Sequence, residues 1–399
     1  MSWFARGFFR RVKRRHFIAI DIGSNTAIRS LRFEEMETEA TVVKKLHFEL
    51  PFREKERDLI PLMSEHLRRL IFQYLREIGH VPDGILIGLG NHFTFNEMAV
   101  ARSERHKPEM VVRERELQEL LTNFLETHRA KILGGRGYTL AHLMPFRITI
   151  DGYPVETLTR ETRGRVIEIT LFATYADEAF WKVLYNLRSV LGGLELRFIS
   201  DQAAVASVLV GVLGVHDALI IKIGARMSEV SLLGDNAIRY TGQFESGGDD
   251  ITGALAKRLK IGRADAERMK RQWGSIQLPE ATKIAFNDAL RAAVANWAEQ
   301  LVKLLKSEEK FSIPERVYLL GGGARLSLIR DALNSLPWFN ELTFLESLDI
   351  RPLGAEDIAS TIFRNTVLPL SGPEEVSLAA LAWRLSSHHG AILPSLQQS

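Results

Sequence analysis

The chain is predicted to be an α/β protein with two related lobes, on the basis of three observations. Residues 18–31 and 218–233 share one build: an apolar run, a charged residue, Ile-Gly, a short polar stretch and a second half-apolar run. Each copy is typical of a strand, turn, strand hairpin. Strand-like and helix-like runs alternate along the rest of the chain. Its 399 residues are also too many for one small core, so several domains are expected.

The first lobe is expected to begin with a hairpin at 17–33 and a third alternating run at 40–50. A helix follows at 59–79 and ends at Gly79, a residue typical of helix C-caps. Residues 83–90, DGILIGLG, have the apolar pattern of a buried strand. A later helix at 177–193 and a strand at 194–200 are expected to return to this first sheet.

Residues 97–175 differ in character and are predicted to be an inserted α+β unit. A polar helix is expected at 111–133, followed by a glycine-rich turn. Two or three strands are expected within 139–155 and 163–174. The lobe would therefore be interrupted by a small unit with its own sheet.

The second lobe is expected to repeat the pattern with a hairpin at 218–233. The glycine pair Gly247 and Gly248 then opens a helix, and one or two further helices are expected at 280–310. A strand at 316–320 runs into three glycines and another helix. A strand, a glycine turn and a helix N-terminus together favour an anion site, because free backbone amides and the helix dipole point at the ligand.

The N-terminal segment is basic and aromatic, and we expect an amphipathic helix at residues 1–15 that lies in a membrane interface. It carries six of the 52 basic residues of the chain and no acid, so the remainder is net acidic. Aromatic rings and cations on opposite faces suit binding to anionic lipid. A solvated basic arm that touches nucleic acid is the alternative, and the aromatic residues argue against it. The membrane residues of this prediction are Trp3, Phe4, Phe8, Phe9, Arg10, Arg11, Lys13 and Arg14.

Composition excludes several other classes of protein. The chain has no cysteine, which excludes disulfides and thiolate metal sites and fits a reducing cytoplasm. Its apolar runs are well short of the roughly 20 residues that span a bilayer. We therefore expect a protein of the cytoplasm, peripheral on the inner face of the cell membrane.

Five motifs together resemble the actin and heat-shock-chaperone ATPase superfamily: IDIGSNT, IKIGARMS, ESGGDDIT, ADAERMK and LLGGGARL. The resemblance implies two duplicated ribonuclease-H-like lobes that hold ATP or ADP between two phosphate hairpins. The inserted unit, with HLMPFRITIDGYPV, resembles the 1C subdomain of the FtsA family, whose members tether FtsZ filaments to the membrane in bacterial division. An FtsA-like, actin-related scaffold is therefore expected.

The resemblance also divides the chain. Subdomain 1A is expected at 16–96 and 176–215 around a 1C unit at 97–175. Subdomain 2A is expected at 216–250 and 311–370 around a shortened, mostly helical 2B at 251–310. A helix at 371–388 would return to 1A, and 389–399 would form a tail. Between Gly274 and Lys283 the chain is too short for the hairpin that FtsA inserts in 2B, the lobe that docks the FtsZ tail.

Site residues are implied by position within the matched motifs. Asp21 would contact Mg²⁺ through water, and Glu267 and Lys270 would hold ribose and adenine. Asp201 and Gln202 stand where relatives orient the attacking water, with a polar start to a buried helix as the alternative. The full nucleotide set implied by the resemblance is Asp21, Gly23, Ser24, Asn25, Thr26, Lys222, Gly224, Ser228, Gly247, Gly248, Glu267, Lys270, Gly321, Gly322, Gly323 and Ala324.

The second hairpin departs from the superfamily pattern. An acidic residue and three glycines are usual there, whereas this chain has Lys222 and keeps only Gly224. Phosphoryl transfer then lacks metal activation, so at most weak ATPase activity is expected. Lys222 could instead neutralise a phosphate in place of part of the Mg²⁺. The alternatives are an empty site, with Lys222 and Arg226 in solvent, and an ordinary ATPase.

Three functions stay open at this point. The first is an FtsA-like scaffold that attaches through its N-terminus, as some MreB proteins do, self-associates through 1C and binds an FtsZ tail or another short peptide. The second is a PilM-like platform of a type IV pilus or secretion assembly, whose partner would be the short N-terminal tail of a membrane protein. The third is an exopolyphosphatase-like enzyme, which needs the acidic second hairpin that this chain lacks.

Overall fold

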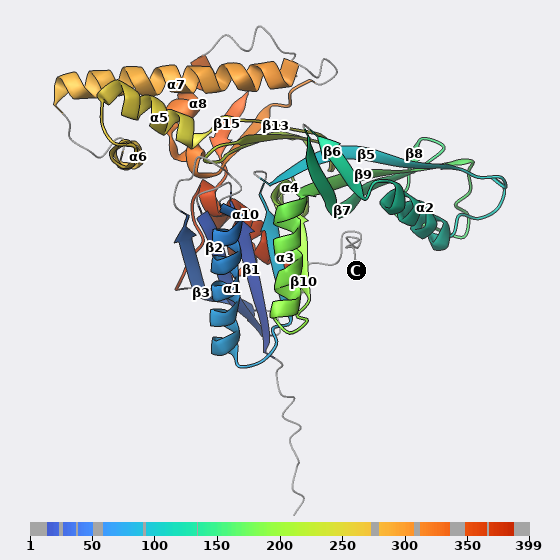
Figure 1. Ribbon diagram of the computed structural model, residues 1–399. Helices are drawn as coiled ribbons and strands as arrows, with labels where there is room; N and C mark the ends of the chain where they lie inside the picture. The colour runs from blue at the N-terminus through green and yellow to red at the C-terminus, as the bar shows by residue number, and fades with distance from the viewer. Residues whose placement is uncertain are drawn as a thin grey trace, which may run out of the picture.

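The computed structural model describes residues 14–23, 27–36, 39–50, 59–90, 93–133, 135–272, 279–306, 312–335, 348–364 and 367–386. Two large sheets lie one above the other with helices between them and outside them, and a third sheet projects to one side (Figure 1). The predicted α/β class with two lobes is confirmed.

The sheet of the first lobe has the strand order β10-β4-β1-β2-β3. Strands β1 and β2 form the predicted antiparallel hairpin, and β3 extends it. On the other side of β1, strands β4 and β10 run parallel to it. The bounds are β1 Arg15–Ile22, β2 Ala27–Met36, β3 Glu39–Glu49, β4 Gly84–Leu89 and β10 Leu196–Ser200.

The sheet of the second lobe has the order β13-β12-β11-β14-β15, which repeats the first strand for strand. Its hairpin β11–β12 is antiparallel, β13 extends it, and β14 and β15 are parallel to β11. Two sheets of identical order confirm that the similar hairpins belong to duplicated lobes. The bounds are β11 Ala218–Ile223, β12 Ser228–Gly234, β13 Ala237–Phe244, β14 Arg316–Leu320 and β15 Asp349–Pro352.

Helices cover both sheets on both faces. Helices α1 (Leu59–Ile78) and α3 (Glu178–Val190) pack on the outer face of the first sheet. Helices α5 (Gly248–Leu259), α6 (Arg263–Arg271), α7 (Glu280–Lys306) and α8 (Ser327–Ser335) pack outside the second. Between the sheets lie α4 (Asp201–Gly211), α9 (Ala355–Ile362) and α10 (Val376–Leu385).

Two of the helices between the sheets, α4 and α10, are apolar on nearly all sides. Their sequences, DQAAVASVLVG for α4 and VSLAALAWRL for α10, show no amphipathic stripe, and almost all of their residues are buried. An all-round apolar helix is stable only where every face is covered. One core cluster therefore joins the two lobes, and the polar residues within it stand out as candidates for a site.

The third sheet spans residues 94–177 and is antiparallel, with the order β5-β9-β7-β6 and β8 paired to β7. The helix predicted at 111–133 is wrong at its end, because α2 stops at Thr127 and residues 130–133 pair with β7 as a strand. The assignment of this unit to the 1C type stays a prediction. Its elements are β5 Thr94–Glu104, α2 Glu114–Thr127, β6 Ala130–Leu133, β7 Arg136–Ile150, β8 Tyr153–Pro154 and β9 Val166–Asp177.

The expected membrane segment lies almost wholly outside the described residues. Of its named members only Arg14 is described; its side chain is exposed and lies 3.2 Å from Glu34 Oε2. Arg15 already belongs to β1, so a helix that extends to residue 15 is wrong. Within the described ranges, no helix has both the length and the apolar content needed to cross a bilayer.

Candidate functional site

The two hairpins place one charged residue each at the interface between the lobes. Asp21 is the second-to-last residue of β1, and Lys222 holds the same position on β11. Across each hairpin the partner has the opposite charge: Asp21 pairs in register with Arg29, and Lys222 with Glu229. Corresponding positions of the two lobes thus carry charge pairs of inverted sign.

Lys222 forms a buried ion pair with Asp201 of the first lobe. Its Nζ donates to Asp201 Oδ2 at 2.5 Å and lies 3.9 Å from Glu229 Oε1. Burial alone would lower the pKa of Lys222, but the carboxylates of Asp201, Glu229 and Asp21 outweigh it and raise that pKa. The ammonium therefore stays charged at any physiological pH, and the alternative of Lys222 in solvent is wrong.

Asp21 is buried beside this pair. Burial, followed by repulsion from Asp201, raises the pKa of Asp21 to about 7. Its Oδ1 and Oδ1 of Asp201 are both buried without a hydrogen-bond donor among the described residues, and a proton on Asp21 can satisfy both. Arg29 Nη1 lies 3.9 Å from Asp21 Oδ2. Near neutral pH, Asp21 is therefore poised between its charged and neutral forms.

The position of Asp201 depends on the local chain. It is the first residue of α4, directly after β10, where the helix dipole favours a negative charge. Gly88 of β4 makes room for the carboxylate, since a Cβ there would lie 2.5 Å from Asp201 Oδ1. Gly88, Arg29 and Glu229 were absent from the predicted site. Arg29 and Glu229 each had a sequence signal, the place opposite Asp21 or Lys222 in a short hairpin, whereas Gly88 had none.

Gln202 joins three units of the fold. Its Oε1 accepts hydrogen bonds from Asn96 Nδ2 of β5 at 2.9 Å and from Thr241 Oγ1 of β13 at 2.7 Å. Its Nε2 is buried without an acceptor in the described part of the chain. The side chain lies at a small cavity lined by Asp201, Gln202, Val205, Ile220, Lys222, Glu229, Ser231 and Leu320. Asp201 and Gln202 were predicted to orient the attacking water. In the structure their side chains join α4 to β11, β5 and β13.

The turn of the second hairpin packs on the start of α5. Gly248 N donates to Gly224 O at 2.9 Å and Asp249 N to Ala225 O at 2.7 Å. A Cβ at Gly247 would lie 2.5 Å from Gly224 O, so this contact requires glycine. Arg226 lies 3.7 Å from Asp249 and its side chain is mostly buried, so the alternative in which it faces solvent is wrong. Two of the free amides at this helix start are thus already used by the hairpin.

Ser228 is a structural residue in this geometry. It is fully buried, its hydroxyl donates to Ser246 O at 2.7 Å, and it accepts from Trp297 Nε1 at 2.8 Å. Gly23, at the end of the first hairpin strand, donates its amide to Ala27 O at 3.0 Å. The other predicted members of that turn, Ser24, Asn25 and Thr26, lie outside the described residues.

Glu267 and Lys270 of α6 lie together, as the resemblance implied. Lys270 Nζ lies 2.7 Å from Glu267 Oε2 and donates to Gly248 O and Thr252 Oγ1, both at 2.8 Å. Burial would raise the pKa of Glu267, but Lys270 and the hydrogen bonds hold it at about 2. Glu267 keeps partial exposure while Lys270 is buried. The pair fixes α6 on the start of α5.

The glycine loop after β14 packs on the end of the second hairpin strand. Gly321 has φ +80°, and a Cβ there would lie 2.5 Å from Ile223 O. A Cβ at Gly323 would strike the Ile223 side chain at 2.3 Å, whereas Gly322 has open space around it. Ala324 is buried in the same short helical turn. The structure thus brings this loop, the hairpin and the start of α5 together around Ile223 and Gly224.

Comparison with known proteins identifies the architecture. The solved PilM–PilN type IV pilus biogenesis complex contains a chain that superposes with a TM-score of 0.62 at 17% identity, over 92% of this chain and 97% of that one. This chain has the actin-like ATPase fold. A structure of ethanolamine utilization protein EutJ from Carboxydothermus hydrogenoformans has a TM-score of 0.47 at 12% identity and covers 92% of this chain and 89% of that one.

In sequence, the actin-like chain matches the cell division protein FtsA of Streptococcus pneumoniae at 26% identity over 166 residues. The match spans 36% of this chain and 36% of the division protein, about a third of that relative's length. No family model matches the chain.

A divalent ion does not fit the actin-like site of this chain. Among the described residues, no group of three acidic or histidine side chains is arranged to hold a metal ion. The ammonium of Lys222 already lies beside Asp201 and Glu229, and Asp201 is the carboxylate that acts on Asp21. A cation in that space would meet Lys222 at close range, so the residues present disfavour Mg²⁺.

Proposed function

We propose that the protein is an actin-like scaffold of the FtsA type. It attaches to the inner face of the cytoplasmic membrane through its N-terminal segment, self-associates through the inserted unit and recruits division or envelope-assembly proteins. The duplicated fold and the partial match to FtsA support a scaffold. The observation that carries the proposal is the buried ion pair between Lys222 and Asp201. Hydrolysis needs an acidic residue at position 222, and this chain has there a lysine that makes a structural contact instead.

We infer that the scaffold binds ATP or ADP without Mg²⁺ and hydrolyses it weakly or not at all. The candidate contacts are Gly23 to Thr26, Glu267, Lys270 and the loop from Gly321 to Ala324, of which Glu267 and Gly322 keep accessible surface. Bound Mg²⁺ would supply charge neutralisation for phosphoryl transfer. In this chain Lys222 supplies a fixed positive charge beside Asp21, and its own carboxylate partners hold it in place.

Equilibrium binding of a fluorescent ATP analogue tests this part of the proposal. The proteins are the wild type and Lys222→Asp, each in Mg²⁺ and in EDTA. We expect wild-type binding that survives EDTA and metal-dependent binding by the variant. Absence of binding by the wild type in both conditions would show that the site takes no nucleotide. Wild-type binding that requires Mg²⁺ would show that Lys222 does not replace the ion.

The partner is the second open point, and one observation favours an alternative. The structural match to the chain of the PilM–PilN complex covers nearly the whole of both chains, which supports a platform role in a pilus or secretion assembly. Fluorescence anisotropy with two labelled peptides separates the roles: an FtsZ C-terminal tail, and the cytoplasmic N-terminal tail of a PilN-like membrane protein. Binding of the first alone supports the division scaffold, and binding of the second alone supports the platform.

Membrane attachment has its own test. The full chain and a variant without residues 1–13 are sedimented with vesicles of phosphatidylcholine and phosphatidylglycerol. The deletion spares β1, which begins at Arg15. We expect the deletion to abolish sedimentation. Equal sedimentation of the two proteins would contradict attachment through this segment.

A further inference from the structure

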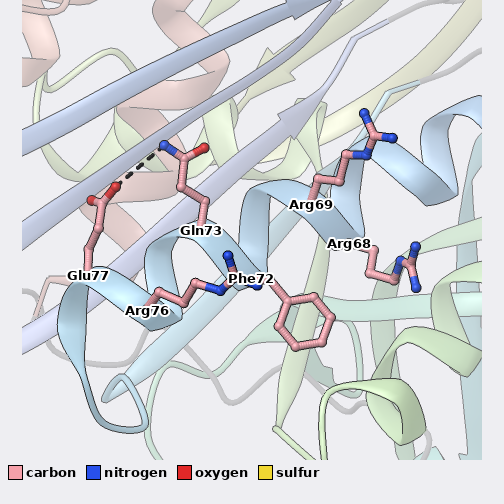
Figure 2. A pocket seen from close by; sticks show the side chains of 6 residues that line it. All are labelled: Arg68, Arg69, Phe72, Gln73, Arg76 and Glu77. Carbon is pink, nitrogen blue, oxygen red and sulfur yellow. Dashed lines mark hydrogen bonds between the residues drawn. The ribbon is translucent and has the colours of Figure 1, made fainter.

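The outward face of α1 is basic and has an aromatic ring at its centre. A spacing of three and four residues places its exposed side chains on one face of the helix. They line a shallow pocket of about 720 Å³, formed by Arg68, Arg69, Phe72, Gln73, Arg76 and Glu77. Figure 2 shows the Phe72 ring between the guanidinium groups of Arg76 and Arg68. Phe72 is 36% exposed, so an apolar surface lies open among cations.

The charges of this pocket are not balanced from within. Arg69 lies 2.5 Å from Glu65, and Glu77 bonds to Lys44, so these charges are paired. Arg68 and Arg76 have no carboxylate within ion-pair distance in the part of the chain that the structure describes. Two cations therefore remain for an anion from outside the fold.

The C-terminal end of α1 lies where the N-terminal segment joins the fold. Strands β1, β4 and β10 are parallel, so they begin at one edge of the first sheet, which we call the basal edge. The rings of His16 and His80 lie 4.7 Å apart there, and His16 N donates to Asp83 Oδ2 at 2.9 Å. The basic, aromatic residues 1–13 therefore attach to the fold at the end of the helix that carries the pocket.

Two exposed apolar side chains mark the same edge. Val81, in the loop between α1 and β4, is 68% exposed. Val190, at the end of α3 and shortly before β10, is 52% exposed. Exposed arginine and apolar side chains together are the composition of surfaces that bind at a lipid headgroup layer, where cations neutralise phosphates and apolar groups reach the acyl boundary.

We propose that the α1 pocket and the basal edge form a second membrane contact, in which Arg68 and Arg76 hold the phosphate of an anionic lipid and Phe72 reaches the acyl boundary. This inference rests on the proposed attachment through residues 1–13. Both an acidic protein segment and a lipid would suit the charge. The lipid is favoured because a membrane bound by residues 1–13 lies within reach of the basal edge, to which those residues are covalently joined.

Vesicle binding by the full chain tests the inference. The vesicles are phosphatidylcholine alone and phosphatidylcholine with phosphatidylglycerol. The test variant is Arg68→Glu with Arg76→Glu, and a second is Phe72→Ser. The control is Arg102→Glu with Arg115→Glu, which makes the same charge change at exposed arginines of the inserted unit. A fourth protein carries Trp3→Ser and Phe4→Ser. Circular dichroism checks that each variant is folded.

We expect the α1 charge variant to bind anionic vesicles about 30-fold more weakly than the control, the factor given by two contacts of about 1 kcal/mol each. Phe72→Ser should weaken binding as well.

Equal binding by the α1 charge variant and the control would overturn the inference. Loss of binding by the Trp3→Ser, Phe4→Ser variant would still support N-terminal attachment in that case. Unchanged binding by the Trp3, Phe4 variant would contradict that attachment itself. The α1 charge variant could also bind vesicles as the control does but lose binding of a poly-glutamate peptide. That result would show that the pocket binds an acidic protein segment, and it would overturn the proposal of a lipid.

Discussion

Lys222 of β11 and Asp201 of α4 form a buried ion pair that crosses from the second lobe to the first, with 2.5 Å between Nζ and Oδ2. Asp21 and Glu229 lie close enough to affect the charge of the same ammonium. The pair therefore joins the two lobes at the point where their hairpins meet.

Replacement of Lys222 by Met should destabilise the fold strongly. The change leaves Asp201 and Glu229 buried without the ammonium that pairs with them, and such a loss costs about 3–5 kcal/mol. Urea unfolding followed by circular dichroism measures the effect. Lys257→Met, at an exposed position of α5, is the control and should change the free energy of unfolding by less than about 0.5 kcal/mol. Asp201→Asn added to Lys222→Met should recover part of the loss. Equal midpoints for Lys222→Met and the wild type would show that the pair does not hold the lobes.

Asp21→Asn should stabilise the protein, and by more as the pH rises toward 7. The pKa of Asp21 rises from 3.8 to about 7 on folding, so between these values the folded chain keeps a proton that the unfolded chain has released. Stability of the wild type therefore falls as the pH rises through this window. Asparagine stays neutral throughout. The free energies of unfolding of the two proteins, measured in urea from pH 4 to 8, should diverge up to about pH 7 and then stay parallel. A difference that does not vary with pH would contradict the assigned proton.

Gly88→Ala should destabilise the fold by about 1–3 kcal/mol through overpacking. A Cβ at this position would lie 2.5 Å from Asp201 Oδ1 and 2.7 Å from the Leu381 side chain. Gly322→Ala is the matched control, because nothing lies within 4 Å of its Cβ position. Thermal unfolding compares the two variants. Similar melting temperatures for both would mean that the space beside Asp201 is not confined.

Gln202→Leu should loosen both β5 of the inserted unit and β13 of the second lobe from α4. The change removes the acceptor shared by Asn96 and Thr241, and the loss of two such hydrogen bonds costs about 1–3 kcal/mol. Hydrogen exchange should then rise in β5 and β13 together. Gln118→Leu, at an exposed position on α2, is the control and should leave both strands unchanged. Faster exchange in only one of the two strands would contradict the bridge.

The sequence predicted the elements whose patterns are local. The Asp21 and Lys222 hairpins, the helix that ends at Gly79 and the glycine loop at Gly321 all formed where expected. The strand at 94–104 was missed because its side chains are mostly half-buried, so TFNEMAVARSE lacks a clear alternation. Residues 130–133 read as the end of a helix, and became a strand because β7 offers them a partner.

The motifs named residues that the structure brings together at the interface, but their arrangement could not be predicted, and their part in nucleotide binding stays a prediction. The motifs named Asp21, Asp201, Gln202 and Lys222, but the partner of Lys222 depends on how two separate sheets stack. That stacking is set by the apolar helices between them, which leave no periodic signal from which the distance across the interface could be derived. The stacking of the sheets places Lys222 against Asp201 and buries it, so the alternative in which Lys222 faces solvent is wrong.

The inverted charge pairs at corresponding positions of the two sheets also bear on how the chain finds its native pairing. Duplicated halves can dock with their own kind on a neighbouring chain during synthesis. Two first lobes in that arrangement would bring two Asp21 carboxylates together, and two second lobes would bring two Lys222 ammonium groups together. Unlike halves instead place Lys222 of one lobe beside Asp201 and Asp21 of the other, so the inverted charges favour pairing of the two lobes within one chain.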